Sequence, residues 1–308
     1  MTEDHHFFGG DHTEIKLDIL QKYLKTYTAA LKQKFRGKLW YIDAFAGTGS
    51  RTIKTDAAPA DLFREAEPER IETRRGSAKI ALDIKPEFDR LIFMDARSKH
   101  CDALRTLAAA HPDRDITVAE GDANKLIQEK IKWDGWKATR AVLFLDPYGT
   151  EVEWATLQAI AATKAIDVWY LFSLAGLYRN AARDISAVDP SKRRTLTRLL
   201  GTDEWEAEIY STVKRPDDLL GALDLPEVRQ RHSDVAGLES YVQRRLRTIF
   251  PAVLPPFGLP LPTEKGPQRF SLFFAVSNDS PAAINLASRF GGHILRAPIT
   301  ASRHKSDR

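Results

Sequence analysis

Four aspartates occupy equivalent places in the sequence, each close behind a short apolar run. Asp43 follows LWYI, Asp95 follows LIFM, Asp122 follows ITVAEG and Asp146 follows AVLFL. Carboxylates accept hydrogen bonds from hydroxyl, amino and amide groups. If the apolar runs are parallel strands, their carboxyl ends meet at the sheet edge where doubly wound proteins bind ligands. We therefore expect four carboxylates to converge on one ligand site.

Glycines mark the turn after the first of these runs. The segment DAFAGTGS places Gly47 and Gly49 directly behind Asp43, and glycine permits both positive φ angles and a close backbone approach to a ligand. A tight strand-to-helix turn without a ligand would use the same residues. We favour a ligand loop because of its position at a strand end. The residues predicted to line it are Asp43, Phe45, Ala46, Gly47, Thr48 and Gly49.

Three cofactors compete for such a loop. The dinucleotide fingerprint G-x-G-x-x-G requires a third small residue, and Thr52 stands in its place. The triphosphate pattern G-x-x-x-x-G-K-[ST] is absent from the chain. S-adenosylmethionine requires an acid that binds the ribose hydroxyls, and Asp95 is suited to this role. It also requires a polar contact to the adenine, to which we assign Asp122 and Ala123. The sequence favours this cofactor over NAD, although both aspartates could instead be helix N-caps.

The segment LFLDPYG supplies the candidate catalytic residues Asp146, Pro147 and Tyr148. An acid followed by proline at a strand end forms a rigid turn with a carboxylate in the cleft. Such a carboxylate can hold the amino group of a nucleobase, and an aromatic ring can stack on a flipped base. Methyl transfer to a base amino group is the predicted reaction. An ordinary β-turn after a strand is the alternative.

The residues between these motifs alternate between strand-like and helical patterns, which predicts an α/β fold with a doubly wound parallel sheet. Apolar residues recur at three- and four-residue steps over 13–31, which indicates an amphipathic helix. Further helices are expected at 78–84, 100–110, 154–163 and 280–290. Strand-like runs occupy 39–43, 91–95, 116–122, 141–149, 166–174 and 269–278.

We divide the chain into four parts. Residues 1–35 form an N-terminal helical segment, and 36–178 form the cofactor-binding core. Residues 179–250 show helical patterns with no strand pattern between them, so we predict a helical insertion for substrate recognition. Residues 251–308 comprise a proline-rich connector, the last core strand and helix, and a polar tail. Within the core, the polar segment 51–76 is predicted to cap the ligand site.

Basic residues in the predicted insertion are candidates for binding an anionic acceptor. Arg193 and Arg194 lie in one cluster, and Arg244 and Arg245 lie in another. A solvated helix surface is the alternative interpretation, because acidic residues are interspersed. On the first helix, His12 and Lys16 are four residues apart and share a face. That face could close over the cofactor cleft or simply be solvated.

Composition excludes several classes of protein. The chain has 308 residues, 43% of them hydrophobic and 29% charged, as in a soluble globular protein. Its longest uncharged apolar run, 168–178, is half of the roughly 20 residues that span a bilayer. No basic and apolar leader opens the sequence, so we expect a cytoplasmic protein with no membrane partner. A net charge of +4 permits a nucleic-acid partner.

One cysteine and an incomplete histidine pair limit metal chemistry. Cys101 is the single cysteine, so neither an internal disulfide nor a cysteine-based zinc site can form. His5 and His6 are adjacent but lack further ligands nearby. We therefore predict no metal.

Taken together, DAFAGTG, the acid in MDA, GDAN and FLDPYG resemble the class I, Rossmann-type S-adenosylmethionine-dependent methyltransferases over residues 36–175. HTEIKLDIL, YIDAFAGTGS, RRGSAKIAL, GDAN and FLDPYG resemble more narrowly the three-Cys-motif partner protein family, TcmP, over most of the chain. The resemblance implies a methyltransferase fold and a partner protein with three cysteines. It also leaves a second role open, that of a cofactor-binding regulatory partner without catalysis.

One motif departs from the amino-methyltransferase pattern. Enzymes of that kind carry D-P-P-Y or N-P-P-Y, whereas this chain has Asp146, Pro147, Tyr148 and Gly149 and lacks the second proline. The aromatic residue thus comes one place early. The stacking role of Tyr148 is less secure for this reason than the role of Asp146.

Overall fold

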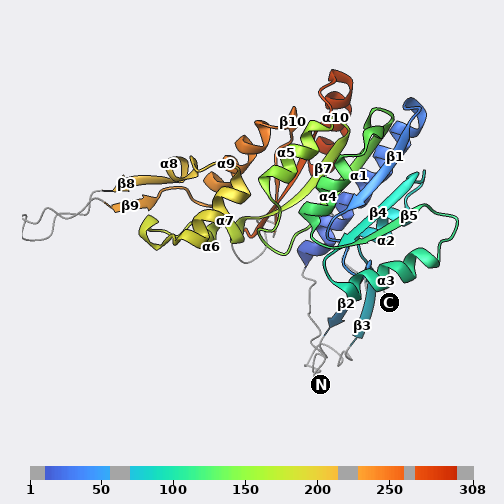
Figure 1. Cartoon of the computed structure of the whole chain (residues 1–308), viewed down its shortest axis with the longest axis horizontal. Helices are drawn as coiled ribbons and strands as arrows, with labels where there is room; N and C mark the ends of the chain where they lie inside the picture. Colours follow the sequence, from blue (N-terminus) through green and yellow to red (C-terminus); the bar gives the residue numbers. More distant parts are fainter. Residues whose placement is uncertain (1–10, 56–69, 214–227, 260–267, 297–308) are drawn as a thin grey trace, which may run out of the picture.

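The computed structural model describes residues 11–55, 70–213, 228–259 and 268–296, and an eight-stranded sheet lies at their centre (Figure 1). The strand order is β10-β12-β7-β6-β1-β4-β5, and β11 pairs with β12. The strands are β1 (Lys38–Asp43), β4 (Arg90–Asp95), β5 (Ile116–Glu120), β6 (Thr139–Leu145), β7 (Ile166–Ser173), β10 (Ala252–Val253), β11 (Phe257–Leu259) and β12 (Phe270–Val276).

The sheet is parallel over its first five strands. β5, β4, β1, β6 and β7 run in one direction, which is the order 3-2-1-4-5 of a doubly wound fold. β12 pairs antiparallel with β7, and β10 pairs antiparallel with β12. A dinucleotide-binding sheet has its sixth strand in the place that β12 takes here. The predicted doubly wound Rossmann-type sheet is confirmed, with one antiparallel strand added.

Helices cover both faces of the sheet because its central strands are apolar on both sides. On one face lie α1 (Asp11–Lys34), α2 (Ser77–Asp83) and α10 (Pro281–Arg296), and α3 (Ser98–Ala109) packs at their margin. On the other lie α4 (Ala123–Ile131), α5 (Trp154–Ala162), α6 (Leu174–Asn180), α7 (Pro190–Leu200), α8 (Trp205–Ile209) and α9 (Val235–Arg247). Short 3-10 turns occupy η1 (Asp134–Ala138) and η2 (Ile185–Ala187).

Aromatic contacts fix the N-terminal helix on the sheet. The ring of Tyr23 lies 5.2 Å from Trp169 of β7 and 4.7 Å from Phe274 of β12, measured between centroids. All three side chains are buried. Aromatic pairs at this separation add to the stabilisation that burial provides. The helix predicted over 13–31 is therefore an integral layer of the core, and its first turns reach the carboxyl ends of β1 and β6.

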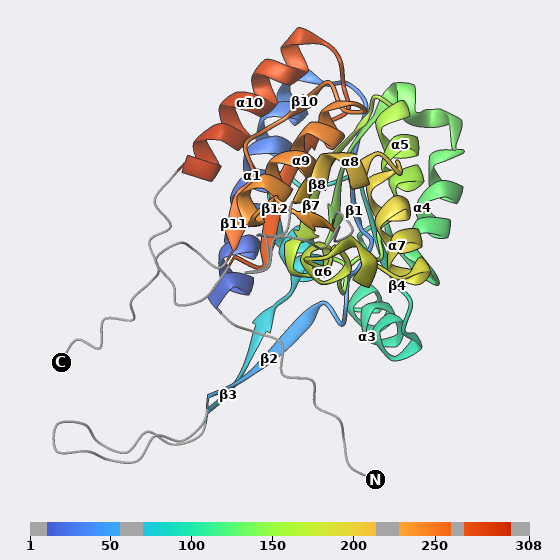
Figure 2. The ribbon, with the colours of Figure 1, turned by 90° about the vertical axis from the view of Figure 1, so that its left-hand side faces the viewer.

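Two β-ribbons lie where the sequence predicted none. β2 (Ser50–Thr55) and β3 (Arg70–Arg75) pair antiparallel and project away from the sheet (Figures 1 and 2). β8 (Tyr210–Val213) and β9 (Val228–Arg231) form a second ribbon at the far end of the insertion. The prediction of a purely helical insertion at 179–250 is wrong in this respect. These strands are four to six residues long and polar, so they lack the apolar run by which the core strands are recognised.

The proline-rich connector is more structured than expected. Its residues 252–253 and 257–259 form β10 and β11, which pair with the two ends of β12. The insertion helices share the apolar core of the sheet: Leu196, Leu246 and Phe250 are buried in the same cluster as Ile92 and Leu143. The insertion is thus packed against the sheet.

Several predictions fall on residues outside the described ranges. These are the paired His5 and His6, the tail from 302 to 308, part of the segment 51–76 and the last residues of the connector. His12 lies in α1, but its side chain is not among those described. Within the described ranges, no helix has the length and apolar character needed to cross a membrane.

Candidate functional site

The carboxyl ends of β1, β4 and β6 bring three of the four predicted aspartates to one sheet edge. Asp43, the last residue of β1, is level with Phe93 of β4 and Phe144 of β6. Two residues further along β4 is Asp95, and two residues further along β6 is Asp146. The chain leaving β1 is fixed between these neighbours, because Ala44 N–H donates to the Phe144 carbonyl at 3.2 Å and Ala46 N–H to the Met94 carbonyl at 3.0 Å.

The glycine loop adopts the conformation that its sequence predicts. Gly47 has φ +60° and Gly49 has φ +74°, both in the left-handed region. A Cβ built on Gly47 would meet no atom within 4 Å, so open space adjoins the loop at this point. Phe45 is partly buried, Ala46 is buried, and Thr48 is exposed and donates its hydroxyl to the Ser50 carbonyl at 2.5 Å. The loop is a tight turn with open space beside its first glycine.

A third glycine completes the loop, and the sequence analysis missed it. Gly76 N–H donates to the Gly49 carbonyl at 2.9 Å, and a Cβ on Gly76 would lie 3.0 Å from that backbone. Gly76 directly precedes α2 and lets the loop pack closely against this helix. In the dinucleotide fingerprint this is the role of the third small residue, a place that Thr52 takes by sequence. The β2-β3 ribbon is inserted between the second and third glycines. The signal was RRGSAKIAL, in which a glycine stands at a helix start.

Asp95 anchors the loop. Its Oδ2 accepts from Gly47 N–H at 3.0 Å and its Oδ1 from Arg97 N–H at 2.9 Å. The residue is only 4% exposed. Nδ1 of His100 lies 3.1 Å from Oδ1, but the two atoms are not aligned for a hydrogen bond, so that buried nitrogen has no partner among the described residues. A carboxylate accepts about four hydrogen bonds, and Asp95 therefore keeps acceptor capacity for a ligand.

Asp43 is completely buried beneath the loop. It accepts from Tyr41 O–H at 3.2 Å and from Phe45 N–H at 3.3 Å, and also from the side chain of Ser77, the first residue of α2. Burial raises the pKa of Asp43 to about 7, and the nearby charge of Asp146 adds to the rise. This carboxyl therefore changes its protonation state near neutral pH.

Asp146 is held by a lysine from the N-terminal helix. Nζ of Lys16 lies 2.5 Å from Oδ2 of Asp146, and Lys16 is only 8% exposed. The Asp146 side chain retains 24% exposure, so one side of the carboxylate still faces solvent. Removing one partner of a covered ion pair leaves an uncompensated charge, which is costly. The face of Lys16 does reach the predicted cleft, and its partner is the predicted catalytic acid.

The rest of the DPYG turn is partly open. Pro147 is buried, whereas Tyr148 is 49% exposed, with the guanidinium carbon of Arg97 lying 4.9 Å from its ring centroid. Gly149 has φ +113°. Burial raises the pKa of Tyr148, so its hydroxyl remains protonated at neutral pH. Tyr148 offers an aromatic face beside Asp146.

The GDAN motif has a structural role at this edge. Asp122 is exposed and caps α4 by accepting from Lys125 N–H at 3.0 Å. Ala123 is buried. The next residue, Asn124, donates to the Glu151 carbonyl at 2.9 Å and accepts from Glu153 N–H at 2.9 Å, so it links α4 to the chain after β6. Asn124 was not predicted. The contact of Asp122 and Ala123 with an adenine remains a prediction.

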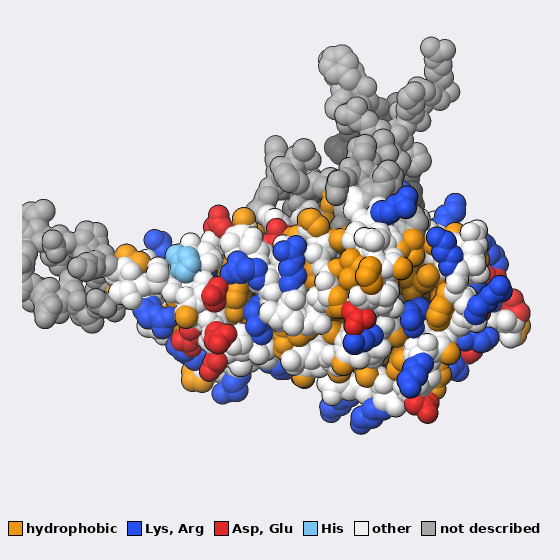
Figure 3. Space-filling model, turned by 90° about the horizontal axis from the view of Figure 1, so that it is seen from above, with side chains coloured by type: hydrophobic (Ala, Val, Ile, Leu, Met, Phe, Trp, Pro, Cys, Tyr) orange, Lys and Arg blue, Asp and Glu red, His pale blue; other side chains and the backbone are white. Residues whose placement is uncertain are grey.

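Three of the four predicted substrate-binding arginines have partners inside the insertion. Arg193 is paired with Glu206, and Arg244 with Glu208 at 3.0 Å. Arg245 donates to the Leu200 carbonyl at 3.1 Å and lies over the ring of Trp154. Arg194 is exposed. On the face seen in Figure 3, acidic side chains also lie among the basic ones. These arginines thus contribute to packing, and their role in binding an acceptor stays a prediction.

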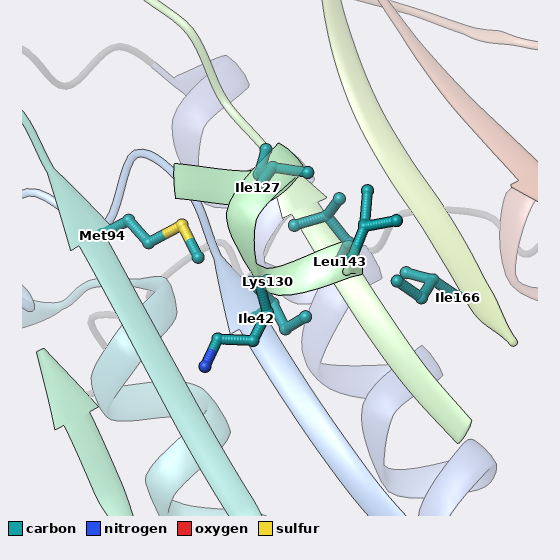
Figure 4. A pocket seen from close by; sticks show the side chains of 7 residues that line it. Ile42, Met94, Ile127, Lys130, Leu143 and Ile166 are labelled. Carbon is teal, nitrogen blue, oxygen red and sulfur yellow. The ribbon is translucent and has the colours of Figure 1, made fainter. Parts of the chain in front are cut away.

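A small apolar gap lies away from this edge. It is lined by Ile42, Met94, Ile127, Lys130, Ile131, Leu143 and Ile166, between the sheet and α4 (Figure 4). None of the strand-end acids lines it. Apart from Lys130 its lining is apolar, so the gap belongs to the packing of the core.

The sheet edge carries more negative than positive groups. Asp43, Asp95 and Asp146 converge there with Lys16, and Arg97 lies over Tyr148. Asp122 and Asp95 are close enough to Glu151 to raise its pKa, although burial is the larger cause. An edge of this charge favours a cationic ligand over an anionic one.

Comparisons with known proteins show likeness in fold. No family model matches the chain, and no curated protein matches it. Among solved structures, protein LPL1258 from Legionella pneumophila has 13% identity and a TM-score of 0.47, covering 89% of this chain and 92% of its own. An S-adenosylmethionine-dependent methyltransferase from Clostridium acetobutylicum has 11% identity and a TM-score of 0.36, covering 83% and 92%.

A third neighbour was solved with a ligand. It is the N-terminal domain of EvdMO1 with SAH bound, at 12% identity and a TM-score of 0.37, covering 83% of this chain and 79% of its own. All three TM-scores are below 0.5. These likenesses therefore add nothing about this chain beyond what its own topology shows, and its function has to be inferred from the site.

The raised pKa of Asp43 predicts a pH-dependent stability. An unfolded aspartate titrates near pH 3.9, whereas the folded Asp43 titrates near 7. Between these values the folded state binds more protons, so the free energy of unfolding falls as pH rises. Asp43→Asn removes this loss, and its stability relative to the parent should increase by on the order of 1–4 kcal/mol from about pH 4 to about pH 8. Denaturant melts at several pH values measure it.

Asp167 provides the matched control. It lies at the start of β7, at the opposite edge of the sheet, and burial raises its pKa to about 7 as well. Because its pKa is raised to the same value, Asp167→Asn should show the same trend with a similar size. A stability difference between Asp43→Asn and the parent that does not change with pH would contradict the assignment.

Proposed function

We propose that the chain is an S-adenosylmethionine-dependent methyltransferase whose cofactor lies against the glycine loop. The observation that carries this proposal is the open space beside Gly47, in a loop whose Gly47 N–H is held by the strand-end carboxylate of Asp95. A left-handed glycine next to open space lets a ligand contact the backbone directly. The carboxylates suit a cation that also carries hydroxyl groups. S-adenosylmethionine has a sulfonium, an ammonium and a ribose diol, so the residues present fit it.

Each part of the cofactor has a residue of matching chemistry. The backbone of residues 45–49 would border the methionyl end, with the buried Asp43 beneath it as a counter-charge for the ammonium. The remaining acceptor capacity of Asp95 suits the ribose hydroxyls. Asp122 and Ala123, at the start of α4, are the candidates for the adenine. When bound, this cofactor supplies an electrophilic methyl group on a positively charged sulfur.

NAD fits the same edge less well. Its pyrophosphate would need the N-terminus of the helix after the glycine loop. Here the carboxyl of Asp43 already lies against Ser77 at the start of α2, and it repels a second anion when ionised. The sixth strand, β12, also runs antiparallel to β7, whereas the dinucleotide-binding sheet is mostly parallel. An NAD-type oxidoreductase is therefore the weaker candidate.

For the acceptor we propose the amino group of a nucleic-acid base. An exocyclic amine is a weak nucleophile and gains from being held in line with the methyl group. The exposed oxygen side of Asp146 can accept a hydrogen bond from that amine, while Lys16 fixes the other oxygen. The ring of Tyr148 lies beside this position and can contact the base. Lys16 thereby orients the acid on which the chemistry depends.

A partner protein with three cysteines is a further proposal, supported by the resemblance of the sequence motifs to the TcmP family. A regulatory role without catalysis would keep the cofactor loop and dispense with Asp146. Catalysis is favoured because Lys16 orients the carboxylate of Asp146. This lysine comes from a helix more than 100 residues earlier in the chain.

Cofactor binding should depend on Asp95. We expect S-adenosylmethionine and S-adenosylhomocysteine to raise the melting temperature and NAD to leave it unchanged, because a ligand at 100 times its dissociation constant stabilises by about 2.7 kcal/mol. Asp95→Asn should weaken binding by about 10-fold to 100-fold, since it removes a charged hydrogen-bond acceptor. Calorimetry measures the affinity. Asp102→Asn, an exposed aspartate paired with Arg105 on α3, is the control. Equal affinities in both variants would refute the ribose assignment.

Methyl transfer should depend on Asp146. With labelled cofactor and fractionated DNA, RNA and protein as acceptors, the label is expected in a nucleic-acid fraction. Asp146→Asn should lower the rate by at least about 100-fold while cofactor affinity stays within a few-fold, as when a transition-state contact is lost. Lys16→Gln should lower the rate less, because the carboxylate remains. Asp18→Asn, on the same helix, is the control. Label in protein alone would exclude the nucleic-acid acceptor.

A further inference from the structure

An exposed tyrosine at the end of α6 is covered by an arginine from a distant strand. Tyr178 is 45% exposed, and the guanidinium carbon of Arg231, on β9, lies 3.4 Å from its ring centroid. Few large apolar side chains are this exposed in the described part of the chain, and Tyr148 of the candidate site is another. Each of these two tyrosines has an arginine over its ring.

The guanidinium of Arg231 lacks hydrogen-bond partners. Its Nε and Nη1 are shielded from water, and neither has a hydrogen-bond acceptor within the described ranges. No described carboxylate forms an ion pair with it. Shielded N–H groups without acceptors are destabilising. Arg229, two residues earlier on β9, differs: it is paired with Glu206 at 3.7 Å and donates to the Glu206 carbonyl at 2.9 Å. Arg231 is thus a cation whose charge no described carboxylate balances, whereas Arg229 is already engaged.

Two further arginines add positive charge near the stack of Tyr178 and Arg231. Arg179 and Arg183 are exposed, and no described carboxylate pairs with either. Arg231 N–H donates to the Arg183 carbonyl at 2.8 Å, so the backbone keeps the two residues adjacent. The neighbouring Asp184 is turned to Ser186, accepting from its N–H at 2.9 Å and its hydroxyl at 2.7 Å. Arg231 therefore lies over this exposed ring, Arg179 follows Tyr178 in the chain, and Arg183 is held to Arg231 through the backbone.

The stack is close to the candidate site. α6 starts at Leu174, directly after the carboxyl end of β7, and so lies at the edge that carries Asp43, Asp95 and Asp146. A Cβ on Gly176 would be 2.9 Å from the side chain of Thr150, so the first turn of α6 touches the end of the DPYG turn. In Figure 2, α6 lies at the end of the sheet from which the β2-β3 ribbon projects.

We propose that Tyr178, Arg179, Arg183 and Arg231 form a binding surface for single-stranded nucleic acid beside the candidate site. The ring of Tyr178 provides a stacking face for a base, and the arginines provide contacts for the phosphates on either side. Aromatic faces alternating with basic side chains are how proteins hold single strands. The proposal rests on the proposed function, for which this surface would hold nucleotides that flank the target base. The acceptor would then bind at α6 and β9, and not at the predicted arginine clusters on α7 and α9.

Binding of a labelled oligonucleotide tests this surface directly. The probe is a fluorescein-labelled single strand of about 12 nucleotides, as DNA and as RNA, followed by anisotropy between about 50 and 200 mM salt. Arg231→Gln should weaken binding by about 5-fold to 10-fold and reduce the salt slope by about 0.7, as expected for one lost phosphate contact on a single strand. Tyr178→Ala should weaken binding by about 5-fold to 100-fold with the parent's slope, and Tyr178→Phe should bind like the parent.

Arg229→Gln is the matched control and should bind like the parent, because Arg229 is committed to Glu206. Three results would overturn the proposal. The first is that the parent does not bind the strand, and the second is that Arg231→Gln and Tyr178→Ala both bind it as tightly as the parent. The third is that polyglutamate displaces the strand as effectively as unlabelled strand does, which would indicate an acidic peptide partner. Calorimetry with S-adenosylmethionine on the same variants separates the two proposals. Strand binding without cofactor binding would contradict the proposed function alone, and the reverse would contradict this surface alone.

Discussion

The hydrogen bond from Gly47 N–H to Asp95 fixes the geometry on which the candidate site depends. It joins the loop after β1 to the end of β4, and the backbone bonds of Ala44 and Ala46 hold the same loop between β6 and β4. Because these contacts come from adjacent parallel strands, the loop cannot move without disturbing the sheet. The contacts that position the loop are thus formed without a ligand, as is usual in the sites of small cofactors.

Electrostatics at this edge follow from placing several acids on neighbouring strands. Burial raises the pKa of Asp43, the charge of Asp146 adds to the rise, and Lys16 pairs with Asp146. The N-terminal helix thus contributes to the chemistry of the site as well as to the core, where Tyr23 packs on Trp169 and Phe274. A positively charged ligand would relieve the repulsion between the remaining carboxylates. The same charge disfavours a pyrophosphate.

Much of this arrangement could be predicted from the sequence, because strand-end acids and glycines obey a rule of topology. Parallel strands that end in aspartate must bring those residues to one edge, whatever the details of side-chain packing. The sequence analysis left open whether the face of Lys16 closes over the cleft or is solvated, because the partner of Lys16 is 130 residues away in sequence and has no local signal. Gly76 was missed because the β2-β3 ribbon separates it from the rest of the glycine loop.

The insertion was the least predictable part. β8 and β9 are short polar strands, and a strand that buries no apolar side is not distinguished by periodicity. The charged partners of Arg193 and Arg244 are glutamates on α8, whose proximity depends on how the helices pack. A cluster of arginines in a sequence therefore identifies positive charge but not charge that is available. Within the described ranges, Arg179 and Arg183 are exposed and no described carboxylate pairs with them, and the same holds for Arg194 of the predicted clusters.

Hydrogen–deuterium exchange in the presence of S-adenosylhomocysteine tests the central claim most directly, because the glycine loop and the strand-end acids should bind the ligand through their own backbone and side chains. The account predicts slower amide exchange in peptides that contain residues 44–50 and 95–101 when this ligand is added, and unchanged exchange when NAD is added. Exchange in those two segments that S-adenosylhomocysteine leaves unchanged, or protection by NAD instead, would contradict it.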